Sequence, residues 1–200
     1  MELTSAQNDV LKELINIGVG KAAALINQMV KVHVGLNVPE IVVLNADEMD
    51  RALYGHGEAS LSTVRMRFRG AFTGCTALIF PRASVSWLVA QLLGDQIEEP
   101  GLDLDSLRIG TIQEVGNIVL NGVIGSIVNI LRVSLDYDTP DYVECGSGEL
   151  LDSLTGADCM ALLIKTHFIL ENGVAEGEVL IVFQITAFDE LIRAVDALLR

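Results

Sequence analysis

Residues 9–16 read DVLKELIN, and residues 110–117 read GTIQEVGN. Each stretch lies inside a long segment whose apolar residues recur at helical spacing, about 5–30 in the first case and 104–131 in the second. Ser5 is expected to cap the first of these helices. The sequence therefore predicts two long helices, one at the start of each half of the chain, and the expected fold is organised around them.

Both helices carry the same pair of polar residues. Glu13 precedes Asn16 by three positions, and Glu114 precedes Asn117 by three. Residues three or four apart share a face of a helix, so each helix should present a carboxylate and a carboxamide together, with Asp9 adding to the first face. Solvated helix surfaces often carry Glu and Asn, and hydrogen bonding within a packed helix pair would also explain each Asn. Asn is, however, a poor helix former, so two copies in mid-helix ask for a reason.

The rest of the chain repeats in the same order. Each Asn is followed after the same 22 residues by a proline, Pro39 or Pro140, and these matched positions differ by a constant 101. Later in each half, two glycines and a phenylalanine match at an offset of 103. The expected strands and closing helices follow from alternation and from helical spacing. We expect strands at about 32–38, 40–45, 60–70, 72–80, 133–137, 141–145, 159–170 and 177–185, and helices at 46–55, 83–94 and 187–199.

These correspondences predict one internally duplicated, pseudo-twofold domain over residues 1–200, with a first repeat at 1–100 and a second at 101–200. The acidic segment 94–105 is the expected joint. Helices followed by paired strands indicate an α/β (α+β) fold, with the two long site helices packed on a largely antiparallel sheet. The small residues of GVGK at 18–21 fit close helix packing better than a phosphate loop, because the full GxxxxGK[ST] pattern is absent.

Composition narrows the function classes. The chain has 200 residues, half of them hydrophobic, and a formal net charge of −14. Nucleic acid and anionic membranes repel such a charge. We see neither a basic-then-apolar start nor a run of roughly 18 apolar residues, so we expect a cytoplasmic protein without membrane insertion.

A metal site of the protein's own is not expected. The three cysteines, Cys75, Cys145 and Cys159, form no CxxC pair and lie in or beside apolar runs, which favours buried free thiols. The three histidines are scattered at positions 33, 56 and 167, without the spacing of a helical metal site.

The pattern Asp-x3-Glu-x2-Asn-x22-Pro resembles the active-site signature of the CheC/CheX/FliY family of chemotaxis phosphatases, and the resemblance covers essentially the whole chain. The residues that carry it are Asp9, Glu13, Asn16 and Pro39 in the first copy and Glu114, Asn117 and Pro140 in the second. There are departures: Gly110 stands where the family has Asp or Ser, Ile15 where Gly usually precedes Asn, and Lys21 where Asn is frequent. These put equal activity of the two copies in question.

The resemblance implies a phosphatase that removes the phosphoryl group from the aspartyl-phosphate of a response regulator, CheY. Asn16 and Asn117 would then orient the hydrolytic water, and Glu13 and Glu114 would dock the receiver through its lysine. The Mg²⁺ ion would belong to the receiver, so the protein would carry no cofactor of its own. The receptor deamidase CheD is a second partner that the resemblance implies.

Several alternatives stay open. The chain could be a non-catalytic adaptor that binds CheD or a receiver, or a protein associated with the flagellar motor switch. Asp9 either assists docking or favours the N-terminal part of the helix dipole. Pro39 and Pro140 are expected to shape turns that enter strands and to have no chemistry.

Overall fold

The computed structural model describes residues 3–30, 33–54, 61–94, 103–154 and 159–199. The helices among them are α1 (Ser5–Met29), α2 (Ala46–Tyr54), α3 (Arg82–Leu93), α4 (Leu104–Leu131), α5 (Ser147–Leu154) and α6 (Ile185–Leu198). The strands are β1 (Gly35–Asn45), β2 (Leu61–Gly70), β3 (Gly74–Pro81), β4 (Leu135–Tyr137), β5 (Asp141–Cys145), β6 (Cys159–Leu170) and β7 (Gly173–Gln184). This confirms the expected mixture of helices with an antiparallel sheet.

The strands of the described residues form one seven-stranded sheet in which every pairing is antiparallel. Its order is β1-β6-β7-β3-β2-β4, and β5 also pairs with β2. Strands of the two halves are interleaved in this sheet: β1 of the first half pairs with β6 of the second, β3 of the first pairs with β7 of the second, and β5 of the second pairs with β2 of the first. The halves 1–100 and 101–200 are therefore interlocked, while the duplication itself stays a prediction.

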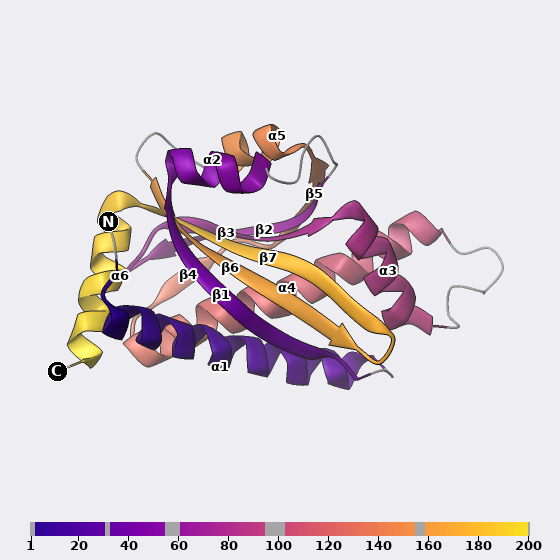
Figure 1. The fold of residues 1–200 in the computed structure, drawn as a ribbon, viewed down its shortest axis with the longest axis horizontal. Coiled ribbons are helices and arrows are strands. Elements are labelled where there is room, and N and C mark those ends of the chain that lie inside the picture. Colours follow the sequence, from indigo (N-terminus) through magenta and orange to yellow (C-terminus); the bar gives the residue numbers. More distant parts are fainter. Residues whose placement is uncertain (1–2, 31–32, 55–60, 95–102, 155–158, 200) are drawn as a thin grey trace.

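Helices cover both faces of the curled sheet (Figure 1). Helices α1, α3, α4 and α6 enclose the larger apolar core against one face, and α2 and α5 enclose a smaller one against the other. Strand β7 shows why both cores form. Ile181 and Phe183 point into the larger core and Leu180 and Val182 into the smaller, as the two-residue period of a strand requires.

The two long helices have well-defined ends. Thr4 caps α1: its hydroxyl accepts from the backbone N–H of Gln7, and the Gln7 side chain accepts from the Thr4 N–H. The prediction that Ser5 is the cap was wrong by one residue. Asp103 caps α4 by accepting from the backbone N–H groups of Asp105 and Ser106. The part of the predicted joint at 95–102 lies outside the described residues.

Helix α4 is long and apolar enough to cross a membrane, judged by length and composition alone. In the fold it is a core helix, because Ile112, Val119 and Val123 are completely buried against the sheet and its neighbours. Packing inside the protein thus accounts for its apolar sequence.

Two local predictions need correction. The segments expected as separate pieces around Pro39 form one strand, β1, with a register shift between Asn37 and Glu40. Pro39 therefore lies at an irregularity within a strand and not in a turn that enters one. Helix α5 was not predicted, because its eight residues are too few to show a helical period.

Candidate functional site

The first polar set lies on the outer surface of α1. Asp9, Glu13 and Asn16 are exposed, whereas the intervening Leu14 and Ile15 are buried. Within the described part of the chain, no hydrogen bond or ion pair engages the three polar side chains. A carboxylate and a carboxamide are thus free to meet a partner from a helix that is held by its opposite face.

The second polar set lies on α4, as the repeat predicts. Glu114 is exposed and, among the described residues, has no ion-pair partner, but Asn117 is half-buried and differs from Asn16. The Asn121 side chain donates from Nδ2 to Oδ1 of Asn117 at 2.6 Å and to the Asn117 backbone oxygen at 2.8 Å. The two sets therefore share residue types but not surroundings.

Helices α1 and α4 meet along an antiparallel seam of small residues (Figure 1). A Cβ at Gly18 would lie 2.4 Å from the backbone oxygen of Gly122, so only glycine allows the observed approach. The Ser126 hydroxyl, buried in the seam, donates to the backbone oxygen of Leu14 at 2.5 Å. This contact lies one residue from Glu13 and fixes the first set relative to the second helix.

The seam also determines where the two sets point. At 100° per residue, Asn16 lies about 160° around the helix axis from Gly18, and Asn117 about 140° from Gly122. Each Asn therefore faces away from the partner helix. In the antiparallel register Asn117 lies beside residue 23, which puts the two Asn residues roughly 10 Å apart along the axis. The sets form two separate sites and not one composite centre.

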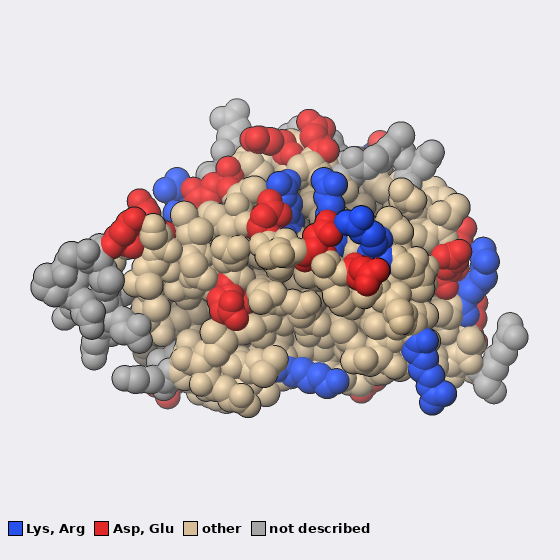
Figure 2. Space-filling view, turned by 180° about the vertical axis from the view of Figure 1, so that it is seen from behind, with Lys and Arg blue, Asp and Glu red and all other residues tan. Residues whose placement is uncertain are grey.

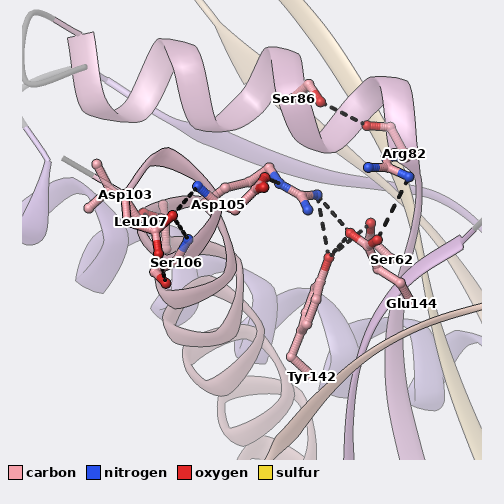
Figure 3. Close-up of polar contacts among 11 residues, drawn as sticks. Ser62, Arg82, Ser86, Asp103, Asp105, Ser106, Leu107, Tyr142 and Glu144 are labelled. Carbon is pink, nitrogen blue, oxygen red and sulfur yellow. Dashed lines mark hydrogen bonds and ion pairs between the residues drawn. The ribbon is translucent and has the colours of Figure 1, made fainter. Parts of the chain in front are cut away.

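A cluster of polar residues holds the N-terminal part of α4 against the sheet. The Arg108 Nη1 lies 2.8 Å from Oε1 of Glu144 on β5, and the Tyr142 hydroxyl donates to the same carboxylate. Ser62 of β2 lies 3.2 Å from the Tyr142 hydroxyl, and Arg82 lies 3.9 Å from Glu144 (Figure 3). Arg108 is under two helical turns from Glu114, so the cluster fixes the orientation of the second set.

The electrostatics of this cluster favour the charged pair. The hydrogen bond from Tyr142, together with the Arg108 guanidinium, holds the pKa of Glu144 below its usual value, and partial burial opposes this only in part. Burial, followed by the hydrogen bond to Glu144, raises the pKa of Tyr142. The ion pair is thus present throughout the neutral range.

The proline that follows the second set has a structural link to it. Gln113, next to Glu114, donates from Nε2 to the backbone oxygen of Pro140 at 3.1 Å. Pro140 immediately precedes β5, so this proline does lie where the chain enters a strand. The prediction for Pro140 agrees with its position, in contrast to that for Pro39.

A hollow of about 640 Å³ adjoins the second set. It lies between the C-terminal ends of α1 and α3 and the first turns of α4, and Glu114 forms part of its wall. Its apolar lining includes Ile26, Leu92 and Val115. Met29, also in the lining, is 56% exposed. The surface beside Glu114 is thus hollowed and apolar, a feature that the sequence did not reveal.

Charge is distributed unevenly on the face seen in Figure 2. Basic and acidic side chains are intermixed in one region of this face, and the surface below it is largely uncharged. Two arginines of β2 are paired with acids: Arg65 binds Asp141 of β5 at 2.9 Å, and Arg69 binds Asp138, the residue after β4, at 2.8 Å. The net negative charge of the chain is therefore not spread evenly over this face.

The residues considered for metal binding do not converge. Among the described residues, no three His, Cys, Asp or Glu side chains lie close enough to hold a metal ion. His33 is exposed, His167 is half-buried in β6, and His56 lies outside the described residues. Burial raises the pKa of the Cys75 thiol to about 11, so this thiol stays protonated at neutral pH.

Sequence reasoning missed two contributors to the site. Asn121 could have been found, because it lies four residues after Asn117 and thus on the same helix face. The cluster around Glu144 could not, because it joins α4, β5, β2 and α3, which are distant in the sequence.

No family model matches the sequence. Among curated proteins, the CheY-P phosphatase CheC of Bacillus subtilis is 24% identical over 136 residues, which cover 68% of this chain and 65% of that protein. CheC1 of Halobacterium salinarum is 25% identical over 139 residues, 70% of this chain and 69% of its own length. The alignment with the first relative thus spans just under two thirds of that protein.

Solved structures share the fold over a larger part of the chain. FliY of Thermotoga maritima superposes with a TM-score of 0.75 at 14% identity, over 98% of this chain and 99% of the other. The FliM middle domain of Vibrio alginolyticus gives 0.65 at 15% identity, over 92% and 99%. CheX in a complex with CheY, BeF3 and Mg²⁺ from Borrelia burgdorferi gives 0.53 at 14% identity, over 86% and 99%.

Proposed function

Because the chain belongs to the CheC/CheX/FliY family, we propose that it is a cytoplasmic phosphatase that hydrolyses the aspartyl-phosphate of a chemotaxis receiver, CheY-P. The observation that carries the proposal is the pair of Glu-x-x-Asn sets. Each set projects from a rigid helix and faces away from the other helix of the seam.

Asn16 and Asn117 supply the chemistry in this proposal. A carboxamide is both a donor and an acceptor, so it can hold a water molecule in line with phosphorus, but it is not basic enough to deprotonate that water. Positioning of the attacking water is most of what phosphoryl transfer requires of a protein. The receiver brings its own Mg²⁺ and lysine, so this protein needs no cofactor.

Glu13 and Glu114 dock the receiver. Their carboxylates are exposed, and they have no ion-pair partner within the described part of the chain, so each can form a charge-assisted hydrogen bond with a lysine of the receiver. That bond sets the register between the helix and the aspartyl-phosphate. Support for CheY as the partner comes from the fold shared with CheX of the CheX–CheY complex. CheD stays a second, separate partner in the proposal.

The FliM likeness favours a second candidate, a protein associated with the flagellar motor that binds a receiver without turnover. FliM middle domains share the fold, and one similar structure is a FliG–FliM complex from Helicobacter pylori. Fold alone does not separate this candidate from a phosphatase, whereas catalysis does.

Decay of a phosphorylated receiver in Mg²⁺ tests the proposal. We expect a catalytic amount of the protein to accelerate phosphate release over many turnovers, each single variant, Asn16→Ala or Asn117→Ala, to retain one working site, and the double variant to retain none. Glu13→Ala and Glu114→Ala serve as comparisons, because they should weaken binding as well as turnover. Binding of the receiver without any acceleration would refute the phosphatase and favour the motor-associated candidate.

A further inference from the structure

The two Asn residues of the proposed sites differ in how tightly their carboxamides are held. Asn121 donates to both oxygens of Asn117, at 2.6 and 2.8 Å, from one turn further along α4. Among the described residues, no hydrogen bond fixes the Asn16 side chain on α1. The residue one turn after Asn16, equivalent to Asn121 at the offset of 101, is Gly20.

We propose that Asn121 is a positioning residue that pre-orients the carboxamide of Asn117 and makes the second Glu-Asn set the better-prepared site. This inference rests on the proposed function, because it concerns the same hydrolysis. It names a residue outside the Glu-x-x-Asn pattern and predicts which of the two sites turns over faster.

The hydrogen bond defines the direction of the Asn117 amide. Only the NH₂ group of Asn121 can donate to Oδ1 of Asn117, so that oxygen faces along the helix toward Asn121. The NH₂ group of Asn117 is thereby left free to donate, and Oδ1 keeps a second lone pair for the water. Without Asn121 the amide can turn about its last bond and exchange its donor and acceptor.

Stability of the helix does not explain the pair. Asn121 is exposed, and Asn is a poor helix former at a mid-helix position. The Asn117 side chain is half-buried, which limits its movement on the other side. The specific consequence of the contact is therefore the orientation of one carboxamide within a proposed active site.

The first site has a glycine, Gly20, at the position equivalent to Asn121, so the same contact can be introduced there. A Cβ at Gly20 would meet nothing within 4 Å, and the position is exposed, so the first atom of a side chain can be added there without displacing any neighbour. An Asn at this position lies four residues after Asn16, as Asn121 does after Asn117. The contact can thus be removed from one site and introduced at the other.

Removal of the contact is tested in the Asn16→Ala background, where only the second site can act. Freeing one side chain corresponds to roughly a two- to tenfold change, so we expect Asn121→Ala to lower kcat by that factor with little change in KM. Asn121→Asp keeps the size but cannot donate to Oδ1, so it should reverse the Asn117 amide and lower kcat at least as much. If the added charge of Asn121→Asp acted only on docking of the receiver, KM would rise while kcat stayed the same. That result would overturn the inference.

The reciprocal test is Gly20→Asn in the Asn117→Ala background, where only the first site can act. We expect kcat to rise, and Gly20→Ala, which adds a side chain without an amide, should leave it unchanged. An equal rise with Ala would mean that the helix and not the carboxamide is responsible, and would overturn the inference. So would an unchanged kcat in both Asn121 variants.

A spectroscopic measurement keeps this inference separate from the proposed function. In ¹⁵N-labelled protein, Asn121→Ala should shift the side-chain amide signals of Asn117 while leaving those of Asn16 in place. Unshifted Asn117 signals would overturn the inference even if the protein hydrolyses phosphate. If the unmodified protein did not stimulate hydrolysis at all but Asn121→Ala still shifted the Asn117 signals, the proposed phosphatase would be refuted and the orienting contact would stand.

Discussion

Replacing Gly18 by Ala should lower the free energy of unfolding, whereas the same replacement at Gly20 should raise it. The two positions lie two residues apart on α1 and gain the same intrinsic helix preference, about 1 kcal/mol. At Gly20 the new methyl group meets nothing within 4 Å, so most of that gain should appear as stability. The pair therefore isolates the effect of packing in the seam.

At Gly18 the new Cβ would lie 2.4 Å from the backbone oxygen of Gly122 and 2.7 Å from the hydroxyl of Ser126. Ordinary contact begins at 3.4 Å, so α1 and α4 must separate by about 1 Å. That movement stretches the hydrogen bond from Ser126 to Leu14, now 2.5 Å, to the limit of its range. Overpacking typically costs about 1–3 kcal/mol, and the weakened hydrogen bond, about 1 kcal/mol, is offset by the similar helix gain, so the net loss is roughly 1–3 kcal/mol.

Equilibrium unfolding in urea measures both variants under the same conditions. We expect the midpoints to move in opposite directions, with stabilities that differ by roughly 2–4 kcal/mol and with similar m values. If the Gly18 variant proved as stable as the Gly20 variant, the seam would not be as close as described, and the positioning of Glu13 and Asn16 by α4 would lose its basis.

Three further predictions follow from the charged and buried groups. Glu144→Gln should lower the free energy of unfolding at pH 7 by about 1 kcal/mol. Because the pKa of Glu144 is held below its usual value, the stabilisation by this carboxylate is complete above the usual pKa and is lost as the pH falls through the lowered pKa. The unfolding curves of the variant and the unmodified protein should therefore converge in acid. Cys75, with its pKa raised to about 11, should resist alkylation in the folded protein at pH 8 and react only on unfolding; rapid labelling, read by mass spectrometry, would contradict its burial. The double variant Glu13→Lys/Glu114→Lys should bind a beryllofluoride-loaded receiver at least about tenfold more weakly, with an unaltered melting temperature. An unchanged affinity in calorimetry would exclude the docking role of these two carboxylates.

The long helices were predictable because their period is local and extends over many turns. Helix α4 has the predicted limits, and α1 begins where predicted and ends one residue earlier, at Met29. The small residues of GVGK at 18–21 were also a readable signal for close helix packing, since Gly18 does lie against Gly122 of α4. Local pattern thus sufficed to place Glu13 and Glu114 on rigid, outward-facing positions.

Strand pairing and side-chain contacts between residues far apart in the sequence could not be predicted from local sequence patterns. Nothing near β1 shows that it pairs with β6, more than a hundred residues later, or that Glu144 of β5 meets Arg108 of α4. Such contacts depend on which edges and faces remain once the core has formed, and no short period in the sequence records them. The roles of Asp9, Glu13, Asn16 and their equivalents likewise stay predictions, because a fold places side chains but does not show turnover.

The most direct measurement is multiple-turnover release of inorganic phosphate from a phosphorylated CheY-type receiver, with the unmodified protein and with the Asn16→Ala/Asn117→Ala double variant. The predicted result is strong acceleration by the first and, with the double variant, the receiver's own slow rate, although the variant still binds the receiver. A double variant that hydrolyses at the full rate would contradict the assignment of the reaction to these two carboxamides.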